Sequence, residues 1–232
     1  MIIKGIQKTT LIDFPDRIAA TIFTFGCNFR CGFCQNPDLV FDNQNIPIIP
    51  EKEVFSFLET KKKWLNGICI TGGEPTLHKD LPEFCKKIKE MGFEVKLDTN
   101  GSNPLMIKEL IERKLVDFIA MDIKTSSEKY SVLCGTAIDF EKIRQSAELI
   151  KNSGLEYEFR STVVPEFFSK EDAALIGEWL KGSKIFVLQQ FRSDLPMVNP
   201  EFKNKQPFSV SELNELKEIL EPFFDKVELK NI

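Results

Sequence analysis

The sequence lacks any uncharged stretch long enough to span a membrane. Its longest run without a charged residue, Ile18–Phe29, contains Thr, Gly, Cys and Asn, whereas a membrane helix needs about 20 predominantly apolar residues. The N-terminal residues MIIKGIQKTT also lack the basic and then apolar layout of a secretory signal. We therefore expect a cytoplasmic protein that has no membrane partner.

An excess of positive charge is also missing. The 232 residues include 31 Lys and Arg against 35 Asp and Glu, which gives a net charge of -4. This is the wrong sign for a protein that binds a phosphate backbone, so nucleic acid is not an expected partner. With 42% hydrophobic residues, 28% charged residues and only 12 Gly and 12 Pro, the composition is that of an ordinary globular protein.

Histidine is nearly absent, since His78 is the only one, while cysteine occurs six times. The cytosol keeps thiols reduced, which argues against a disulfide framework. Three cysteines are packed into the segment CNFRCGFC, at Cys27, Cys31 and Cys34. Of the others, Cys69 lies in a predicted strand and Cys85 in a predicted helix, where both are expected to be small buried apolar residues. Cys134 receives no assigned role.

Short apolar, β-branched runs alternate with amphipathic segments, which is the signal for βα units around a parallel sheet. The predicted strands are Ile18–Phe25, Gly67–Thr71, Phe93–Asp98, Asp117–Asp122, Leu155–Val164 and Lys184–Gln190. The predicted helices cover residues 51–62, 81–91, 139–151, 170–181 and 209–223, and Asn103-Pro104 marks the start of a further one.

Six βα units are too few for a full eight-stranded barrel of ~250 residues. We therefore predict an α/β fold in one domain, 1–232: a partial (β/α)6 TIM-like barrel with parallel strands and outer helices. A doubly wound sheet is the alternative. Residues 1–17 are expected to form an N-terminal extension, 18–190 the six βα units, and 191–232 a C-terminal loop and helix. No Gly- or Ser-rich linker and no internal repeat divides the chain.

Polar motifs follow each of the six predicted strands. In chain order they are FGCNFRCGFC, TGGEP, DTNG, MDIK, FRSTVVP and LQQF. Because the carboxyl ends of parallel strands meet on one rim, where such folds place their functional loops, we expect these motifs to converge.

The three clustered cysteines are candidates for binding a metal centre, because thiolates are soft ligands for iron–sulfur clusters and zinc. A 4Fe–4S cluster would keep one iron open for a substrate. A structural zinc would need a fourth ligand, which only His78 or an isolated cysteine could supply. The spacing favours the cluster over zinc, since zinc sites usually carry paired CxxC motifs, and a purely structural role is a third alternative.

The sequence resembles radical S-adenosylmethionine (SAM) enzymes. CNFRCGFC fits the CxxxCx(aromatic)C loop, with Phe33 as the aromatic residue, and TGGEP follows the next predicted strand. More closely, TTLIDFPDRIAATIFTFGCNFRCGFCQNPDL, together with DTNG and MDIK, resembles activating proteins of glycyl-radical enzymes, such as those of anaerobic ribonucleotide reductase and pyruvate formate-lyase. The resemblance implies one 4Fe–4S cluster on Cys27, Cys31 and Cys34, with SAM bound at the fourth iron.

The resemblance also implies a set of cofactor-binding residues. Gly72, Gly73 and Glu74 would receive the methionyl ammonium of SAM. Asp98, Thr99 and Asp122 would lie near the methionyl group and a bound monovalent cation. Lys124 would pair with the methionyl carboxylate, and Arg160 would add a further contact to SAM. In the alternative interpretation, Asp98 and Asp122 cap the following helices and Lys124 and Arg160 form ordinary salt bridges. Two departures from the family pattern are Gln35, where several relatives carry His or Tyr, and Gln190-Phe191, where some carry a His.

The expected activity is therefore that of an oxidoreductase that creates a radical on the backbone glycine of a partner enzyme, such as anaerobic ribonucleotide reductase. Flavodoxin or ferredoxin is the expected reductant, and no side-chain acid or base is required for catalysis. An open barrel wall suits a macromolecular loop. The alternatives are a radical SAM enzyme that acts on a small molecule, such as a deazapurine-forming synthase, and a non-catalytic iron–sulfur or zinc module.

Overall fold

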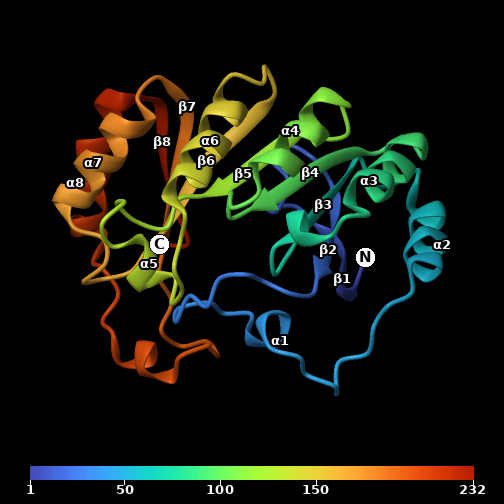
Figure 1. Ribbon diagram of the computed structural model, residues 1–232, viewed down its shortest axis with the longest axis horizontal. Helices are drawn as coiled ribbons and strands as arrows, with labels where there is room; N and C mark the ends of the chain where they lie inside the picture. Colours follow the sequence, from blue (N-terminus) through green and yellow to red (C-terminus); the bar gives the residue numbers. More distant parts are fainter.

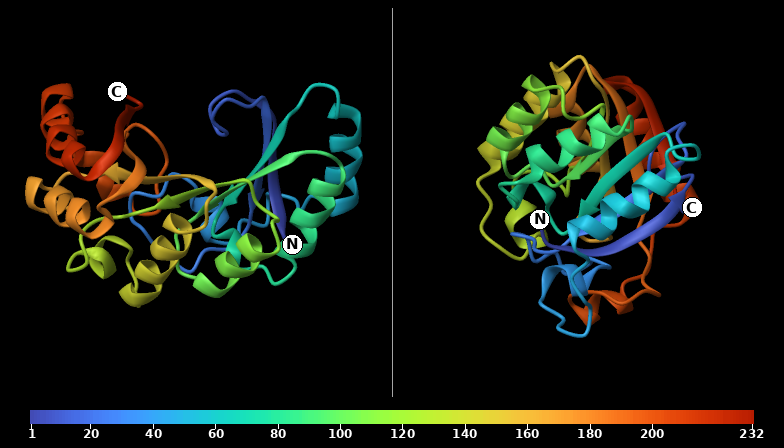
Figure 2. Two further views of the ribbon diagram at one scale, coloured as in Figure 1. Left: turned by 90° about the horizontal axis from the view of Figure 1, so that it is seen from above. Right: turned by 90° about the vertical axis from the view of Figure 1, so that its right-hand side faces the viewer.

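Eight strands form one curved sheet in the computed structural model, which describes residues 1–232 (Figure 1). The strands lie side by side in chain order from β1 to β8. β1 runs antiparallel to β2, and every later pair is parallel. No pairing joins β8 to β1, so the barrel stays open, and Figure 2 shows the two edge strands, blue and red, well apart at opposite ends of the curved sheet. The predicted partial barrel is thus confirmed.

The strands are β1 (Ile3–Thr10), β2 (Ala19–Thr24), β3 (Gly67–Gly72), β4 (Glu94–Thr99), β5 (Phe118–Asp122), β6 (Glu156–Val163), β7 (Ser183–Gln190) and β8 (Phe224–Lys230). The helices are α1 (Pro37–Val40), α2 (Glu51–Lys61), α3 (Leu81–Glu90), α4 (Pro104–Glu112), α5 (Tyr130–Leu133), α6 (Phe140–Lys151), α7 (Lys170–Leu180) and α8 (Val210–Leu220). Short 3-10 turns occupy Pro75–Leu77, Pro200–Asn204 and Glu221–Phe223. None of the helices is both long and apolar enough to cross a membrane.

The helix starts follow local capping chemistry. The side chain of Asn103 accepts a hydrogen bond from Met106 N at the start of α4, with Pro104 as the first helical residue. Ser169 and Ser209 each form a reciprocal capping box, at α7 and α8. The helix starts predicted at Asn103-Pro104 and at Ser209 are confirmed.

Strands β2 to β7 match the six predicted strands, whereas β1 and β8 were not predicted. β1 has the sequence IKGIQKTT and β8 the sequence FDKVELK, so polar residues interrupt both. Both lie at an edge of the sheet. The search for short apolar, β-branched runs therefore missed both strands.

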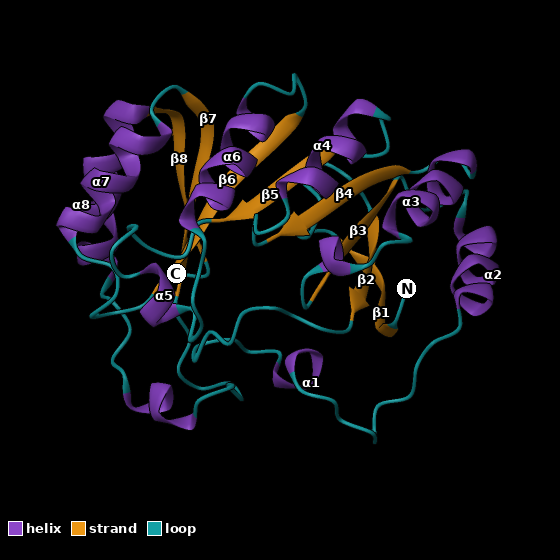
Figure 3. Ribbon diagram, viewed as in Figure 1, coloured by secondary structure: helices purple, strands orange, loops and turns teal.

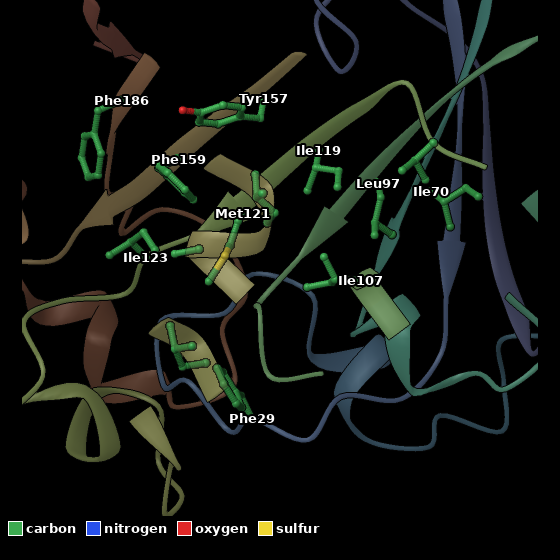
Figure 4. Packing of buried hydrophobic residues seen from close by; sticks show 14 of the residues in the cluster. Phe29, Ile70, Leu97, Ile107, Ile119, Met121, Ile123, Tyr157, Phe159 and Phe186 are labelled. Carbon is green, nitrogen blue, oxygen red and sulfur yellow. The ribbon is translucent and has the colours of Figure 1, made fainter. Parts of the chain in front are cut away.

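The two faces of the sheet differ in chemistry. Side chains that alternate along the strands, such as Leu97, Ile119, Met121 and Phe159, pack against the helices and form the main core (Figure 4). Figure 3 shows the helices covering this outer face. The intervening residues lie on the concave inner face of the sheet and are largely polar; Lys96, Asp98, Glu158 and Arg160 are among them. The core therefore lies between sheet and helices, and the concave face is left for function.

Removal of a core side chain should destabilise the fold much more than removal of the same side chain at the surface. Leu97 in β4 is 0% exposed, whereas Leu105 in α4 is 79% exposed. We expect Leu97→Ala to lower the free energy of unfolding by about 2–5 kcal/mol because it leaves a cavity. Leu105→Ala should change it by about 0.5 kcal/mol or less. Urea denaturation measures both, and equal effects would contradict the assignment of the core to this side of the sheet.

Candidate functional site

A cavity of about 250 Å³ opens at the carboxyl ends of the strands. The loop after β2 lines it together with residues at the carboxyl ends of β3, β4, β5, β6 and β7 or just after them, as the convergence of the six polar motifs predicts. The cavity brings together every residue that the sequence singled out: Cys27, Cys31, Cys34, Gly72, Gly73, Glu74, Asp98, Thr99, Asp122, Lys124 and Arg160.

The loop that carries the three cysteines follows β2 and is held by backbone hydrogen bonds from distant segments. Arg30 N donates to the carbonyl oxygen of Cys134 at 2.8 Å, and Asn199 N donates to that of Gly32 at 2.9 Å. A Cβ atom at Gly32 would lie 2.4 Å from the ring of Phe202, so only glycine fits beneath this ring. Figure 1 shows the loop after β7 running beside the cysteine loop below the sheet. These contacts fix the shape of the loop.

The thiols of Cys27, Cys31 and Cys34 are free and share the cavity. Burial raises the pKa of Cys27 to about 12 and also raises that of Cys34. No three His, Cys, Asp or Glu side chains converge closely enough to hold a single metal ion. His78 lies outside the cavity, and its Nε2 atom is 3.0 Å from the carbonyl oxygen of Phe25. His78 is therefore not placed to serve as the fourth ligand of a zinc ion.

The glycines of TGGEP join the end of β3 to the cysteine loop. Gly73 N donates to Thr24 O at 2.9 Å, and Glu74 N donates to Gly26 O at 2.7 Å. A Cβ atom at Gly73 would lie 2.0 Å from Gly26 O, and Gly72 has a positive φ of 124°. Glycine is therefore required here for close contact between two backbone segments.

Glu74 is fully buried, and its carboxylate is bonded to the protein. Its oxygens accept hydrogen bonds from Thr76 N at 3.1 Å, Thr99 Oγ1 at 2.8 Å and Asn100 N at 2.6 Å, and from the hydroxyl of Thr76. Burial raises its pKa, against the effect of these hydrogen bonds. The residue thus ties the end of β3 to the end of β4, and the sequence did not predict this role.

Oppositely charged side chains from β4, β5 and β6 form a buried network beside the cysteines. Arg160 donates to Asp98 at 3.1 Å and to Asp122 at 2.5 Å, and Lys124 donates to Asp122 at 2.9 Å. Lys96 pairs with Asp98 from within β4. Burial opposes ionisation of both carboxyls, but Arg160 and the two lysines outweigh it, so the pKa values of Asp98 and Asp122 lie below the ordinary range.

The alternative interpretation of these charges is partly wrong. Asp98 and Asp122 do not cap helices, since the residue that caps α4 is Asn103 and the one before α5 is Lys129. Lys124 and Arg160 do form ion pairs, but these pairs are largely buried at the cavity. Both carboxylates expected near a monovalent cation already have side-chain cations as partners.

Three of the lining residues that were not predicted as site residues bear directly on ligand binding. Asn100 donates to Asn28 Oδ1 at 3.0 Å and approaches Cys27 Sγ at 4.0 Å, and the motif DTNG contained it. Gln190 has a buried Oε1 atom that lacks a hydrogen-bond partner. Asn231 follows β8, so no signal for it existed without that strand. An unpaired buried acceptor beside three thiols suits a ligand that carries hydrogen-bond donors, as SAM does.

Glu74→Gln should destabilise the protein. Each carboxylate oxygen of Glu74 accepts from a backbone N–H, Thr76 N on one and Asn100 N on the other. A glutamine NH2 group must therefore face an N–H donor in either orientation, which costs about 1–3 kcal/mol. Urea denaturation should show this loss, while the surface control Glu141→Gln stays near the native value. A stable Glu74→Gln protein would contradict the bonding described.

Arg160→Met should lower the stability of the protein at neutral pH and make that stability less sensitive to acid. The depressed pKa values of Asp98 and Asp122 stabilise the fold above the ordinary aspartate value of 3.8, and this stabilisation is lost as the pH falls through the native values. Without Arg160 both native pKa values rise toward the ordinary value, so stability at pH 7 falls by roughly 3 kcal/mol. Less of this stabilisation is then left to be lost as the pH falls, and the difference from the native protein shrinks.

Unfolding free energies between pH 3 and 7 test this expectation, with Arg144→Met as the control because Arg144 is exposed and only weakly paired. A stability difference from the native protein that did not shrink toward pH 3 would refute the role given to the network.

Comparison with known proteins agrees with this site. The sequence profile of the Radical SAM superfamily matches residues 21–175. A protein of Methanocaldococcus jannaschii with the provisional name glycyl-radical enzyme activating enzyme is 33% identical over 100% of this chain and 96% of its own length. The pyruvate formate-lyase-activating enzyme of Clostridium pasteurianum is 27% identical over 77% of this chain and 76% of its own.

Among solved structures, a domain of pyruvate-formate lyase-activating enzyme from Bacteroides vulgatus superposes with a TM-score of 0.55. It is 17% identical and the match covers 72% of this chain and 99% of that domain, a likeness that shows the fold. The family is shown by the profile and by the relative of nearly equal length. The chain belongs to the radical SAM superfamily, whose enzymes work with a 4Fe–4S cluster and SAM.

Proposed function

We propose that this protein creates a glycyl radical on a partner enzyme. The observation that carries the proposal is the continuity between the cysteine-lined cavity and a wide chamber on the concave face of the sheet. The chamber measures about 890 Å³ and shares Asp98, Arg160, Gln189 and Asn231 with the cavity. Radical chemistry at the cavity is thus accessible from the side of the barrel.

Cys27, Cys31 and Cys34 would each bind one iron of the cluster, which leaves the fourth iron for the methionyl group of SAM. Together the cluster and SAM would supply reductive cleavage of SAM, and with it the radical chemistry needed to remove a hydrogen atom from glycine. The task of the chain is to hold these groups and to keep water away. No side-chain acid or base is needed for this chemistry.

The charged network supplies the contacts for a zwitterionic ligand. Lys124 lies 5.8 Å from the ring centroid of Phe33, the aromatic residue of the cysteine loop, so its ammonium is placed for the methionyl carboxylate. Its pKa is raised, because Asp122 and the Cys31 sulfur outweigh the effect of burial, so it keeps its charge. Arg160 would add a second cationic contact. A separate monovalent cation stays a prediction, since Arg160 lies between its two expected ligands, Asp98 and Asp122.

The open chamber supports a macromolecular substrate over a small metabolite. Inner-face residues of β4, β6 and β8 and the loop between β1 and β2 line the chamber. In that loop, Leu11 and Ile12 are 72% and 82% exposed. Exposed apolar residues beside a chamber mouth are suited to contact with another protein. A flexible loop that carries the target glycine could enter here and reach the cavity.

The electron has to come from outside the protein, and flavodoxin or ferredoxin stays the predicted donor. Cys27 and Cys34 are only partly buried, so the cysteine loop lies close to the surface. This placement keeps the cluster near a docked donor.

SAM cleavage tests the chemistry. After anaerobic reconstitution of the cluster and addition of dithionite and SAM, the native protein should form 5'-deoxyadenosine. Cys27→Ala, Cys31→Ala and Cys34→Ala should each lose the cluster and at least ~99% of this activity, because a lost ligand leaves a second iron without protein coordination. Cys85→Ala, a control buried elsewhere in α3, should retain both.

The partner is tested separately. The cluster-loaded protein is mixed with an anaerobic ribonucleotide reductase and SAM, and electron paramagnetic resonance is used to detect a glycyl-radical doublet. A doublet that disappears when the target glycine is replaced by alanine would support the proposal. SAM cleavage that depends on a free metabolite and gives no protein radical with any glycyl-radical enzyme would instead support the small-molecule alternative.

A further inference from the structure

Asn100 is a buried polar residue that the proposed function does not use. It follows β4 directly, is 5% exposed and lines the cavity together with the three cysteines. A buried side-chain amide needs partners for the two N–H groups of its nitrogen and for its oxygen. The partners of Asn100 connect it to one of the three cluster cysteines.

The position of Asn100 is fixed by its backbone and by its side-chain oxygen. The backbone N–H donates to Glu74 Oε2 at 2.6 Å, which ties the residue to the end of β3. The Oδ1 atom accepts a hydrogen bond from Ser102 N at 2.9 Å. Because a backbone N–H can only donate, this bond settles the orientation of the amide, and the NH2 group points to the opposite side.

The NH2 group of Asn100 faces the cysteine loop. One of its N–H groups donates to Asn28 Oδ1 at 3.0 Å, and the amide nitrogen of Asn28 in turn donates to Ser102 Oγ at 2.9 Å. The same Nδ2 atom of Asn100 lies 4.0 Å from Cys27 Sγ, which leaves the second N–H for the sulfur. Cys27 Sγ also accepts a hydrogen bond from Phe29 N at 3.4 Å.

The contact between Asn100 and Cys27 is long because a neutral thiol is a weak hydrogen-bond acceptor. A thiolate bound to iron carries negative charge, and hydrogen bonds to charged acceptors are shorter and stronger. The bonds from Glu74 and Ser102 hold the donor in place, so it is directed at the sulfur whether or not the sulfur is charged.

A hydrogen bond to a ligand sulfur affects the redox properties of an iron–sulfur cluster. The reduced cluster carries one more negative charge than the oxidised cluster, and part of this charge resides on the ligand sulfurs. A donor at such a sulfur therefore stabilises the reduced form more than the oxidised form, and reduction potentials of these clusters depend on hydrogen bonds to sulfur.

We propose that Asn100 is a positioning residue whose side-chain amide donates a hydrogen bond to Cys27 Sγ and raises the reduction potential of the cluster. The inference rests on the 4Fe–4S cluster of the family and does not depend on which substrate receives the radical. Through Cys27, Asn100 makes the transfer of an electron to the cluster easier.

A redox titration followed by electron paramagnetic resonance tests the proposal on the cluster-loaded protein. In Asn100→Ala, the ratio of reduced to oxidised cluster at a fixed potential should fall by roughly three- to tenfold, as expected for loss of one hydrogen bond. Asn100→Asp keeps the acceptor for Ser102 N but replaces the NH2 donor by a charged oxygen, so its ratio should fall further. An Asn100→Ala protein with the native ratio would overturn the proposal.

Asn28→Ala is the matched control, because it removes the other partner of the Asn100 NH2 group and leaves the donor beside Cys27 in place. Its ratio should stay within about twofold of the native value, less than the effect of one lost hydrogen bond. An equal fall in Asn28→Ala and Asn100→Ala would assign the effect to packing of the cysteine loop and would also overturn the proposal.

A second measurement detects the hydrogen bond directly. In protein labelled with 15N in its asparagine side chains, pulsed electron paramagnetic resonance of the reduced cluster should show a 15N coupling that Asn28→Ala retains and Asn100→Ala loses. Absence of this coupling from the native protein would overturn the proposal even where SAM cleavage proceeds normally. A cluster that shows the coupling but forms no 5'-deoxyadenosine would contradict the proposed function alone, so the two can fail independently.

Discussion

The site depends on the close backbone contact between the end of β3 and the start of the cysteine loop. Two hydrogen bonds, from Gly73 N and Glu74 N, fix these segments together, and the missing side chain of Gly73 allows the approach. Glu74 then extends the connection to Thr99 and Asn100 at the end of β4. Loops from three strands therefore act as one rigid unit, which is the preorganisation that a metal centre and its ligand require.

The buried charges continue this unit across the barrel. Arg160 on β6 bonds to Asp98 on β4 and Asp122 on β5, so three neighbouring strands are joined on their inner face by side chains as well as by the sheet. Such a network is expensive to desolvate and is weak evidence for stability. Its value lies in keeping several charges fixed beside the cavity, where a zwitterionic ligand would meet them without rearrangement of the protein.

The sequence was most informative where the local structure permits only one type of residue. Apolar, β-branched runs marked the six strands in the middle of the sheet, and the polar motifs at their ends contained the residues of the predicted site. The sequence could not show how those residues bond to each other. The motif TGGEP predicted that Glu74 contacts SAM. In the structure its carboxylate instead bonds to Thr99 and Asn100, which only the fold brings close to it. β8, and with it Asn231, was missed because an edge strand needs only one apolar face.

The division of the sheet into an apolar outer face and a polar inner face has a consequence for how this fold changes in evolution. Most of the core lies between the strands and the helices, so substitutions on the chamber walls leave it intact. The exposed charges of Lys184 and Lys226 can therefore diverge at little cost in folding. One scaffold can thus acquire new recognition surfaces by drift of its inner lining alone, while the chemistry at the rim stays the same.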